Sequence, residues 1–126
     1  MPSHRVLIDT KKLALRLAAV ASAKKAEELT VLDVRKIAGF CDFFVIVSAN
    51  SLRQVNAIGQ AIEEELAALG IKPLSRIPSN DESGWIAVDV GSIIVHAFYK
   101  PTREFYALER LWSDAVRLRL PRTITA

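Results

Sequence analysis

Residues 42–70, DFFVIVSANSLRQVNAIGQAIEEELAALG, contain the two elements that decide the fold class. The run 43–47, FFVIV, is continuously apolar but too short for a buried helix, so we expect a strand that is covered on both faces. A helix follows, because Ser51 and Gln54 have the spacing of a capping box and Gly70 is suited to end it. A buried strand followed by an amphipathic helix is typical of an α/β domain.

The segments on either side of this pair predict the rest of the fold. The expected elements are a helix from Asp9 or Thr10 to about residue 25, strands at 30–34, 72–77, 85–90 and 93–99, and a final helix from Pro101 through Leu111, Trp112 and Ala115 that ends before Pro121. The last two strands are separated by a short turn and form a hairpin. The sequence therefore predicts an α/β fold, with a mixed sheet of about five strands covered by helices.

Length and composition limit the class of protein. The chain has 126 residues, of which 51% are hydrophobic and 25% charged, so we expect one globular domain over 1–126. Its core should span about 10–113 and be followed by a basic tail at 114–126. No apolar run reaches the ~20 residues that cross a bilayer, and no secretory signal is expected. The single cysteine, Cys41, fits a reducing compartment. We expect a cytoplasmic protein without membrane contact, although the basic first 25 residues leave an organelle-targeting role open.

Charge is distributed unevenly along the chain. Residues 1–25 carry a net charge of +5, residues 26–99 carry −5, and residues 100–126 carry +3. One interpretation is a mixed, solvated surface. The other is an acidic middle that meets a basic protein, with ends that tolerate nearby phosphates. No dense basic stripe predicts DNA binding, whereas a minor contact of the tail with RNA remains open beside a solvated helix end.

Residues able to carry catalysis are few. The histidines, His4 and His96, have no nearby cysteine or acid at metal-ligand spacing, and no glycine pattern indicates a nucleotide site. Cys41 has no adjacent activating cation, so we expect a buried, inert thiol. We therefore expect no enzyme activity, metal or cofactor. The alternative is a metal-dependent nucleotide-processing enzyme that uses Asp42 and Asp89, although the simpler interpretation is that both carboxylates cap turns.

Two aromatic residues and one histidine are candidates for a binding surface. Trp85 and Tyr106 do not fall readily into the predicted core, and both residue types are favoured anchors at protein interfaces. For Trp85, an interface and a core position remain equally open. His96 lies within an apolar strand, which predicts either a core histidine with one hydrogen bond or an interface contact.

Four segments together resemble the Iojap, or ribosomal silencing factor, family. Residues 42–46, DFFVI, are similar to a strand of that family, and 51–55, SLRQV, to the start of its helix. Residues 85–98, WIAVDVGSIIVHAF, resemble its hairpin, and 103–112, REFYALERLW, resemble its C-terminal motif. Each motif alone is weak, but four in the same order and spacing are specific. The resemblance covers about 10–113.

This resemblance implies a nucleotidyltransferase-like topology without catalytic acids. It also implies binding to the large ribosomal subunit at its fourteenth protein, which sterically blocks joining of the small subunit and represses translation. Free members of the family are expected to form homodimers. The partner-binding residues that the matched motifs imply are Trp85 as the anchor, Asp89 as a charge for a basic partner, Val90 and Gly91 at the hairpin tip, His96 and Tyr106.

The sequence departs from the family before the hairpin. Members of the family commonly carry a Glu-Gly pair where this chain has Pro78-Ser79. Proline restricts the backbone and removes an amide donor, which puts the path of the chain toward Trp85 in doubt.

Overall fold

The computed structural model describes residues 9–75, 83–106, 110 and 112–121, with residues 105 and 106 as backbone only. The elements in chain order are α1 (Thr10–Ala23), β1 (Glu27–Asp33), β2 (Phe43–Ala49), α2 (Leu52–Ala68), β3 (Trp85–Asp89), β4 (Ile93–Tyr99), α3 (Lys100–Tyr106) and β5 (Val116–Arg117). None of the helices in the described ranges has the length and apolarity needed to cross a membrane. The predicted Pro78-Ser79 departure lies outside these ranges.

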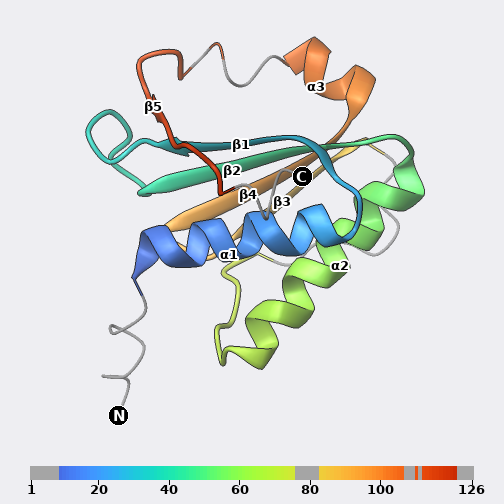
Figure 1. Cartoon of the computed structure of the whole chain (residues 1–126), viewed down its shortest axis with the longest axis horizontal. Helices are drawn as coiled ribbons and strands as arrows, with labels where there is room; N and C mark the ends of the chain where they lie inside the picture. The colour runs from blue at the N-terminus through green and yellow to red at the C-terminus, as the bar shows by residue number, and fades with distance from the viewer. Residues whose placement is uncertain (1–8, 76–82, 107–109, 111, 122–126) are drawn as a thin grey trace.

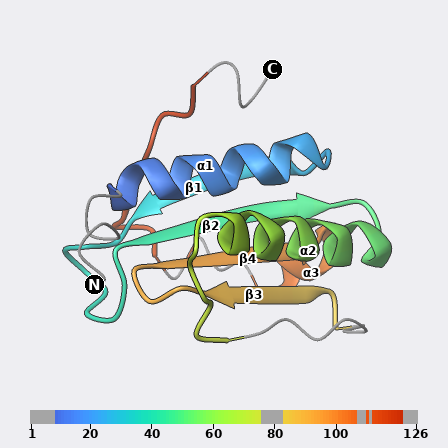
Figure 2. The same cartoon turned by 90° about the horizontal axis from the view of Figure 1, so that it is seen from below.

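The five strands form one mixed sheet in the order β3-β4-β2-β1-β5. β2 pairs with β4 in parallel, and the other three pairings are antiparallel. Both α1 and α2 lie against the same face of the sheet (Figures 1 and 2). Every residue of β2 is buried, because this central strand has helices on one face and aromatic side chains on the other. The expected mixed sheet of about five strands is confirmed.

The start of α2 also ties the two helices together. Ser51 Oγ accepts a hydrogen bond from the Gln54 amide at 3.1 Å, as the capping box predicts. Gln54 Oε1 accepts from the amide of Asn50 at 2.7 Å, one residue earlier than in a standard capping box. Its Nε2 donates to the carbonyl oxygens of Lys24 and Lys25, where α1 has ended. One side chain therefore holds the start of α2 against the end of α1.

The strand expected at 72–77 is wrong in its described part. Residues 71–75 form no strand, and residues 76 and 77 lie outside the described ranges. Pro73 has no amide hydrogen to give to a ladder. The amide of Leu74 instead donates one hydrogen bond to the carbonyl of Asp89, at 2.7 Å.

The fifth strand comes from the C-terminal segment instead. The final helix was expected to continue through Trp112 and Ala115, but residues 112–114 form a turn. Val116–Arg117 then pairs with the outer edge of β1, and the amide of Leu118 donates to the carbonyl of Val31. The open edge of β1 offers backbone hydrogen bonds that a longer helix would leave unmade. The apolar residues of this segment, which predicted a helix, therefore belong to a turn and an edge strand.

Candidate functional site

The sheet face turned away from α1 and α2 carries a group of aromatic rings, here called the aromatic face. Successive side chains of a strand point to opposite faces, so β2, β3 and β4 each contribute alternate residues to it. The ring contacts on this face join Phe40, Phe44, Trp85, His96, Phe98 and Trp112.

Trp85 and His96 form the polar centre of the aromatic face. Trp85 Nε1 donates a hydrogen bond to His96 Nδ1 at 3.1 Å. The indole stacks on Phe98 at 5.1 Å between ring centroids, and the imidazole meets Phe44 edge-on at 5.2 Å. His96 is 7% exposed, so the prediction of a core histidine with one hydrogen bond is confirmed. Trp85 is half-buried, so it is neither a full core residue nor a freely exposed one.

The hydrogen bond fixes the chemical state of His96. Because Nδ1 accepts from Trp85, the neutral ring carries its proton on Nε2, for which no described residue supplies an acceptor. Burial lowers the pKa of His96 to about 4, and the charge of Asp89 opposes this shift with a smaller effect than burial. The imidazole is therefore neutral near pH 7 and acts as an acceptor for the indole.

The turn between β3 and β4 is held by Asp89. Its Oδ1 accepts from the amide of Gly91 at 2.8 Å, and the amide of Val90 donates to the carbonyl of Ile93. Gly91 has φ +90°, a conformation that favours glycine. The simpler interpretation of Asp89 as a turn cap is thus confirmed. Val90 packs partly against the core beneath the helices.

The predicted site residues form a strip along the hairpin rather than a pocket. Trp85 begins β3 and Asp89 ends it, which separates them by about 13 Å along an extended strand. His96 lies opposite Ala87, between these two ends. Tyr106 is the last residue of α3, and its side chain lies outside the described atoms. The structure therefore brings Trp85 and His96 into contact and leaves the hairpin tip apart from them.

Asp42 and Asp89 lie at the same end of the sheet. Burial raises the pKa of the Cys41 thiol to about 11, and the charges of both carboxylates add to this shift. Cys41 is therefore the buried, unreactive thiol that the sequence predicts. Within the described ranges, no group of three or more His, Cys, Asp or Glu side chains is placed to hold a metal ion.

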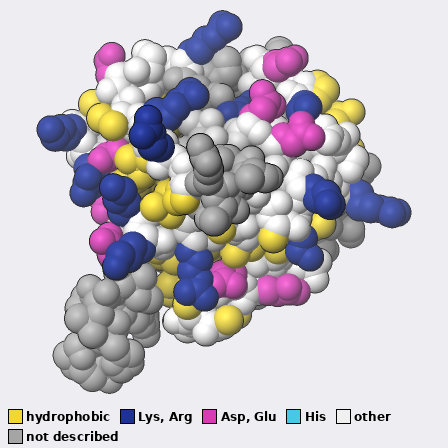
Figure 3. All heavy atoms as spheres, viewed as in Figure 1, with side chains coloured by type: hydrophobic (Ala, Val, Ile, Leu, Met, Phe, Trp, Pro, Cys, Tyr) yellow, Lys and Arg dark blue, Asp and Glu magenta, His cyan; other side chains and the backbone are white. Residues whose placement is uncertain are grey.

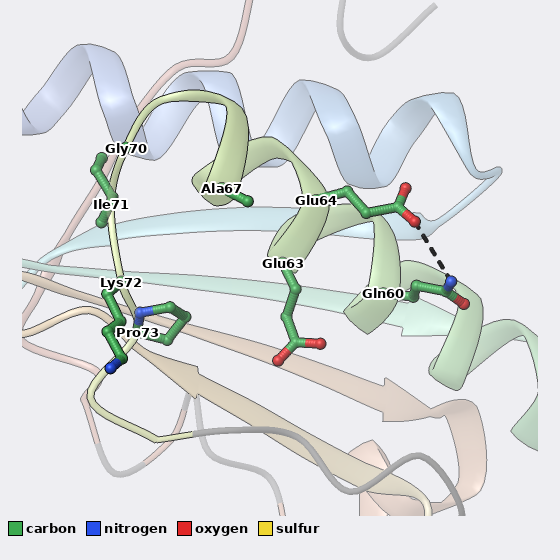
Figure 4. A pocket seen from close by; sticks show the side chains of 8 residues that line it. All are labelled: Gln60, Glu63, Glu64, Ala67, Gly70, Ile71, Lys72 and Pro73. Carbon is green, nitrogen blue, oxygen red and sulfur yellow. Dashed lines mark hydrogen bonds between the residues drawn. The ribbon is translucent and has the colours of Figure 1, made fainter.

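A separate hollow of about 590 Å³ lies on the outer side of α2 (Figure 4). It is bounded by the second half of that helix and by the chain that follows it. Glu63 and Lys72 bring opposite charges to its two sides. None of the predicted site residues lines this hollow, so it is not part of the aromatic face.

Sequence reasoning missed the structural role of Arg103. This arginine of α3 is 7% exposed, and its Nη1 donates to the carbonyl of Glu28 at 2.7 Å and to Ser48 Oγ at 2.8 Å. Its Nη2 donates to Thr30 Oγ1 at 3.1 Å. Glu28 has φ +52° within an irregular stretch of β1, so the arginine reaches an unusual backbone segment. The sequence shows only that an arginine begins the last motif, and it does not indicate that the side chain is buried.

Gly84 was also missed, as the residue that sets the start of β3. It has φ +82°, and a Cβ built on it would lie 2.5 Å from Thr102 Oγ1 in α3. Its carbonyl accepts from the amide of Tyr99 at 2.8 Å. Close approach of α3 to the hairpin therefore needs glycine immediately before Trp85.

Comparison with known proteins gives the family. Residues 8–125 match the family described as "Ribosomal silencing factor during starvation". The chain is 39% identical over 106 residues to ribosomal silencing factor RsfS of Bacillus subtilis, covering 83% of this chain and 89% of that protein. A crystal structure from Bacillus halodurans has a TM-score of 0.71 at 34% identity, covering 84% of this chain and 96% of that one.

The name of a more distant relative mentions assembly of the large ribosomal subunit. It is the mouse "Mitochondrial assembly of ribosomal large subunit protein 1", 30% identical over 99 residues, which are 77% of this chain and 43% of that protein. The match over nearly the whole sequence, together with the shared fold, settles the family of the chain. This protein belongs to the ribosomal silencing factor family.

Proposed function

We propose that the protein binds the large ribosomal subunit at its fourteenth protein and sterically prevents joining of the small subunit, which represses translation. Its family and the name of its mouse relative support a role on the large subunit. Steric blocking requires only that the joining surface is occupied, so no bond is made or broken. The protein acts in the cytoplasm as one domain over 1–126, is not an enzyme and needs no metal or cofactor.

The half-buried Trp85 is the observation that carries this proposal. Its single polar hydrogen is already bonded to His96, and its ring is stacked on Phe98, so the exposed part is a rigid apolar surface. A held aromatic ring loses little conformational entropy on binding, which is the property of an interface anchor. Asp89 then offers a charge to a basic partner, beside Val90 and Gly91 at the hairpin tip.

Further contacts extend this surface. Tyr106 is proposed as a contact from the last helix, and His96 acts from below by holding the indole. A minor contact with ribosomal RNA is proposed for the C-terminal tail, where Arg117 and Arg119 are exposed.

The free protein is proposed to be a homodimer that hides its ribosome-binding surface, a proposal motivated by the aromatic side chains on that surface. Light scattering is expected to give a dimer mass for the free protein and a complex with one copy of each protein once the fourteenth large-subunit protein is added. A dimer that binds this partner without dissociating would contradict the competition.

Co-sedimentation with isolated large subunits tests the function. The wild-type protein is expected to pellet with large subunits and to be absent from small subunits and from joined ribosomes. Trp85→Ala should weaken binding at least about tenfold, because it removes the anchor. Trp85→Phe keeps a ring against Phe98 and is expected to retain more of the affinity. Circular dichroism of each variant checks that the fold is intact.

Two results would contradict the proposal in different ways. Wild-type protein that stays in the supernatant at every concentration would remove the large subunit as partner. Nucleotide binding that depends on a divalent metal, through Asp42 and Asp89, would be tested next. Equal binding by wild type and Trp85→Ala would keep the function and remove Trp85 as its anchor.

A further inference from the structure

The short helix α3 lies close to the start of β3, immediately before Trp85. Gly84 is buried there, and its φ of +82° is one that side chains rarely adopt. A Cβ built on Gly84 would lie 2.5 Å from Thr102 Oγ1 in α3 and 3.4 Å from the Cβ atoms of Thr102 and Tyr99. Carbon atoms in contact prefer separations of about 3.5–4.0 Å. An added side chain therefore has no room between α3 and the start of β3.

Arg103 makes α3 the rigid side of this contact. The helix lies on the face of the sheet opposite to α1 and α2 (Figure 1). Arg103 directly follows Thr102, and its guanidinium donates to Ser48 Oγ, Thr30 Oγ1 and the carbonyl of Glu28. Thr102 itself is β-branched, so rotation about its Cα–Cβ bond is restricted. A side chain added at Gly84 would therefore meet a helix that is fixed to two strands of the sheet.

The start of β3 is the side that is free to move. β3 is an edge strand, which among the described strands pairs only with β4. Its start is held by the bond from the Tyr99 amide to the Gly84 carbonyl, and Ser83 Oγ accepts from the amide of Trp85. A displacement at Gly84 passes directly to Trp85, because the two residues share a peptide bond.

The contacts of the Trp85 ring depend on where its backbone lies. The indole Nε1 donates to His96 Nδ1 at 3.1 Å, and the ring stacks on Phe98 at 5.1 Å between centroids. Both of these partners belong to β4, so a shift of β3 at Trp85 changes both contacts together. Hydrogen bonds weaken steeply as their geometry departs from linear. A displaced ring would lose the fixed orientation that an interface anchor needs.

Charge does not mark a contact region on the face that Figure 3 shows. Lysine and arginine side chains lie there next to aspartate and glutamate, with hydrophobic side chains between them (Figure 3). On a mixed surface of this kind, a rigidly held aromatic ring is the feature that concentrates binding energy. The orientation of Trp85 is therefore the property on which affinity should depend.

We propose that Gly84 and Thr102 are positioning residues for Trp85, so that affinity for the large subunit depends on the contact between α3 and the residue before the anchor. This inference rests on the proposed function, because it takes Trp85 as the anchor. Gly84 and Thr102 act through the position of the indole and need no contact with the partner. In this they differ from Asp89, which is proposed to meet the partner directly.

Co-sedimentation with isolated large subunits tests the dependence on Gly84. Gly84→Ala is expected to weaken binding about tenfold, because the added Cβ meets Thr102 and displaces the anchor. Gly70→Ala is the matched control and is expected to bind like the wild type. Gly70 has φ +74°, but a Cβ built on it has no atom of the described residues within 4 Å. Both variants therefore carry similar backbone strain, and only Gly84→Ala adds a steric contact beside Trp85.

Variants of Thr102 test the contact from the other side. In a Thr102→Ala background the hydroxyl is absent, so Gly84→Ala should weaken binding less than about threefold relative to Thr102→Ala alone. Thr102→Ile enlarges the α3 side and keeps glycine at 84, so it is expected to weaken binding even if Gly84→Ala does not fold. Circular dichroism of each variant checks the fold.

The indole N–H resonance of Trp85 gives a second readout that needs no ribosomes. The chain has two tryptophans, and the indole signal that is lost in Trp85→Phe belongs to Trp85. Its proton is bonded to His96, so its chemical shift reports where the ring lies. We expect Gly84→Ala to move this signal, Gly70→Ala to leave it in place, and Gly84→Ala in the Thr102→Ala background to move it less.

The outcomes separate this inference from the proposed function. Weaker binding and a moved indole signal in Gly84→Ala, both relieved by Thr102→Ala, support the positioning contact. Equal binding by Gly84→Ala and Gly70→Ala, or a loss that Thr102→Ala does not relieve, overturns it and leaves the proposed function in place. A moved indole signal with unchanged binding also overturns it. If the wild type does not bind, the proposed function fails, while an unmoved signal in Gly84→Ala would show separately that α3 does not position Trp85.

Discussion

Replacing Arg103 with methionine is expected to lower the free energy of unfolding by about 3 kcal/mol or more. The guanidinium donates to Ser48 Oγ, Thr30 Oγ1 and the carbonyl of Glu28, and it is almost completely buried. Methionine has a similar length but no donor, so these three acceptors lose the hydrogen bonds that Arg103 donates, and only the contact from Thr30 Oγ1 to the Glu28 carbonyl remains among them. Urea unfolding followed by circular dichroism measures the loss.

An exposed arginine provides the control for this prediction. Arg53 lies on the surface of α2, and Arg53→Met is expected to change stability by less than about 0.5 kcal/mol. Arg103→Lys keeps the charge but not the fork of donors, so it should fall between wild type and Arg103→Met. Equal stability of the two methionine variants would show that the buried arginine contributes nothing net, as some buried charges do.

The central elements were predictable because local and global signals agree there. Residues 43–47 are apolar at every position, and β2 is buried along its whole length as expected. Ser51 and Gly70 mark the two ends of α2, and both positions are confirmed. In these segments, burial, capping and period all favour the same structure.

The C-terminal segment was not predictable in the same way. Its apolar residues also fit a helix, and only the free edge of β1 decides that Val116–Arg117 forms a strand. A helix pattern is a local property, whereas the unpaired edge belongs to β1, which lies more than 80 residues earlier in the chain. For the strand expected at 72–77, the local pattern favoured a strand, but residues 71–75 do not pair with the sheet. Leu74 makes one backbone hydrogen bond to the end of β3, which is not enough to form a strand.

The sequence predicted which residues belong to the candidate site, but not which of them are in contact. Motif positions identified Trp85 and His96, but their hydrogen bond depends on the register of β3 against β4, which the sequence does not give. The same holds for Phe40, which approaches Phe44 and Trp112 only once the sheet has formed. Arg103 was recognised as part of a motif, while its burial depends on the bulge in β1.

Acidification is expected to destabilise the protein through His96. In the unfolded chain, a histidine has a pKa near 6.5, whereas burial lowers the pKa of folded His96 to about 4. Below pH 6.5 the unfolded state therefore binds a proton that the folded state excludes, so stability falls as the pH drops from about 6.5 toward 4. Between pH 7.5 and pH 5 this linkage amounts to about 2 kcal/mol. The hydrogen bond from Trp85 acts in the same direction as burial, because it requires an unprotonated Nδ1.

Urea unfolding over this pH range, compared between wild type and His96→Gln, measures the contribution. Glutamine does not titrate, and its side-chain oxygen can still accept from the Trp85 indole. The variant is expected to lose less stability than the wild type between pH 7.5 and pH 5, by about 2 kcal/mol. Carboxylates titrate in both proteins at the lower end of this range, so their effect cancels in the difference. Parallel pH profiles would show that His96 is reached by protons in the folded state, and that the Trp85–His96 hydrogen bond does not hold the imidazole neutral.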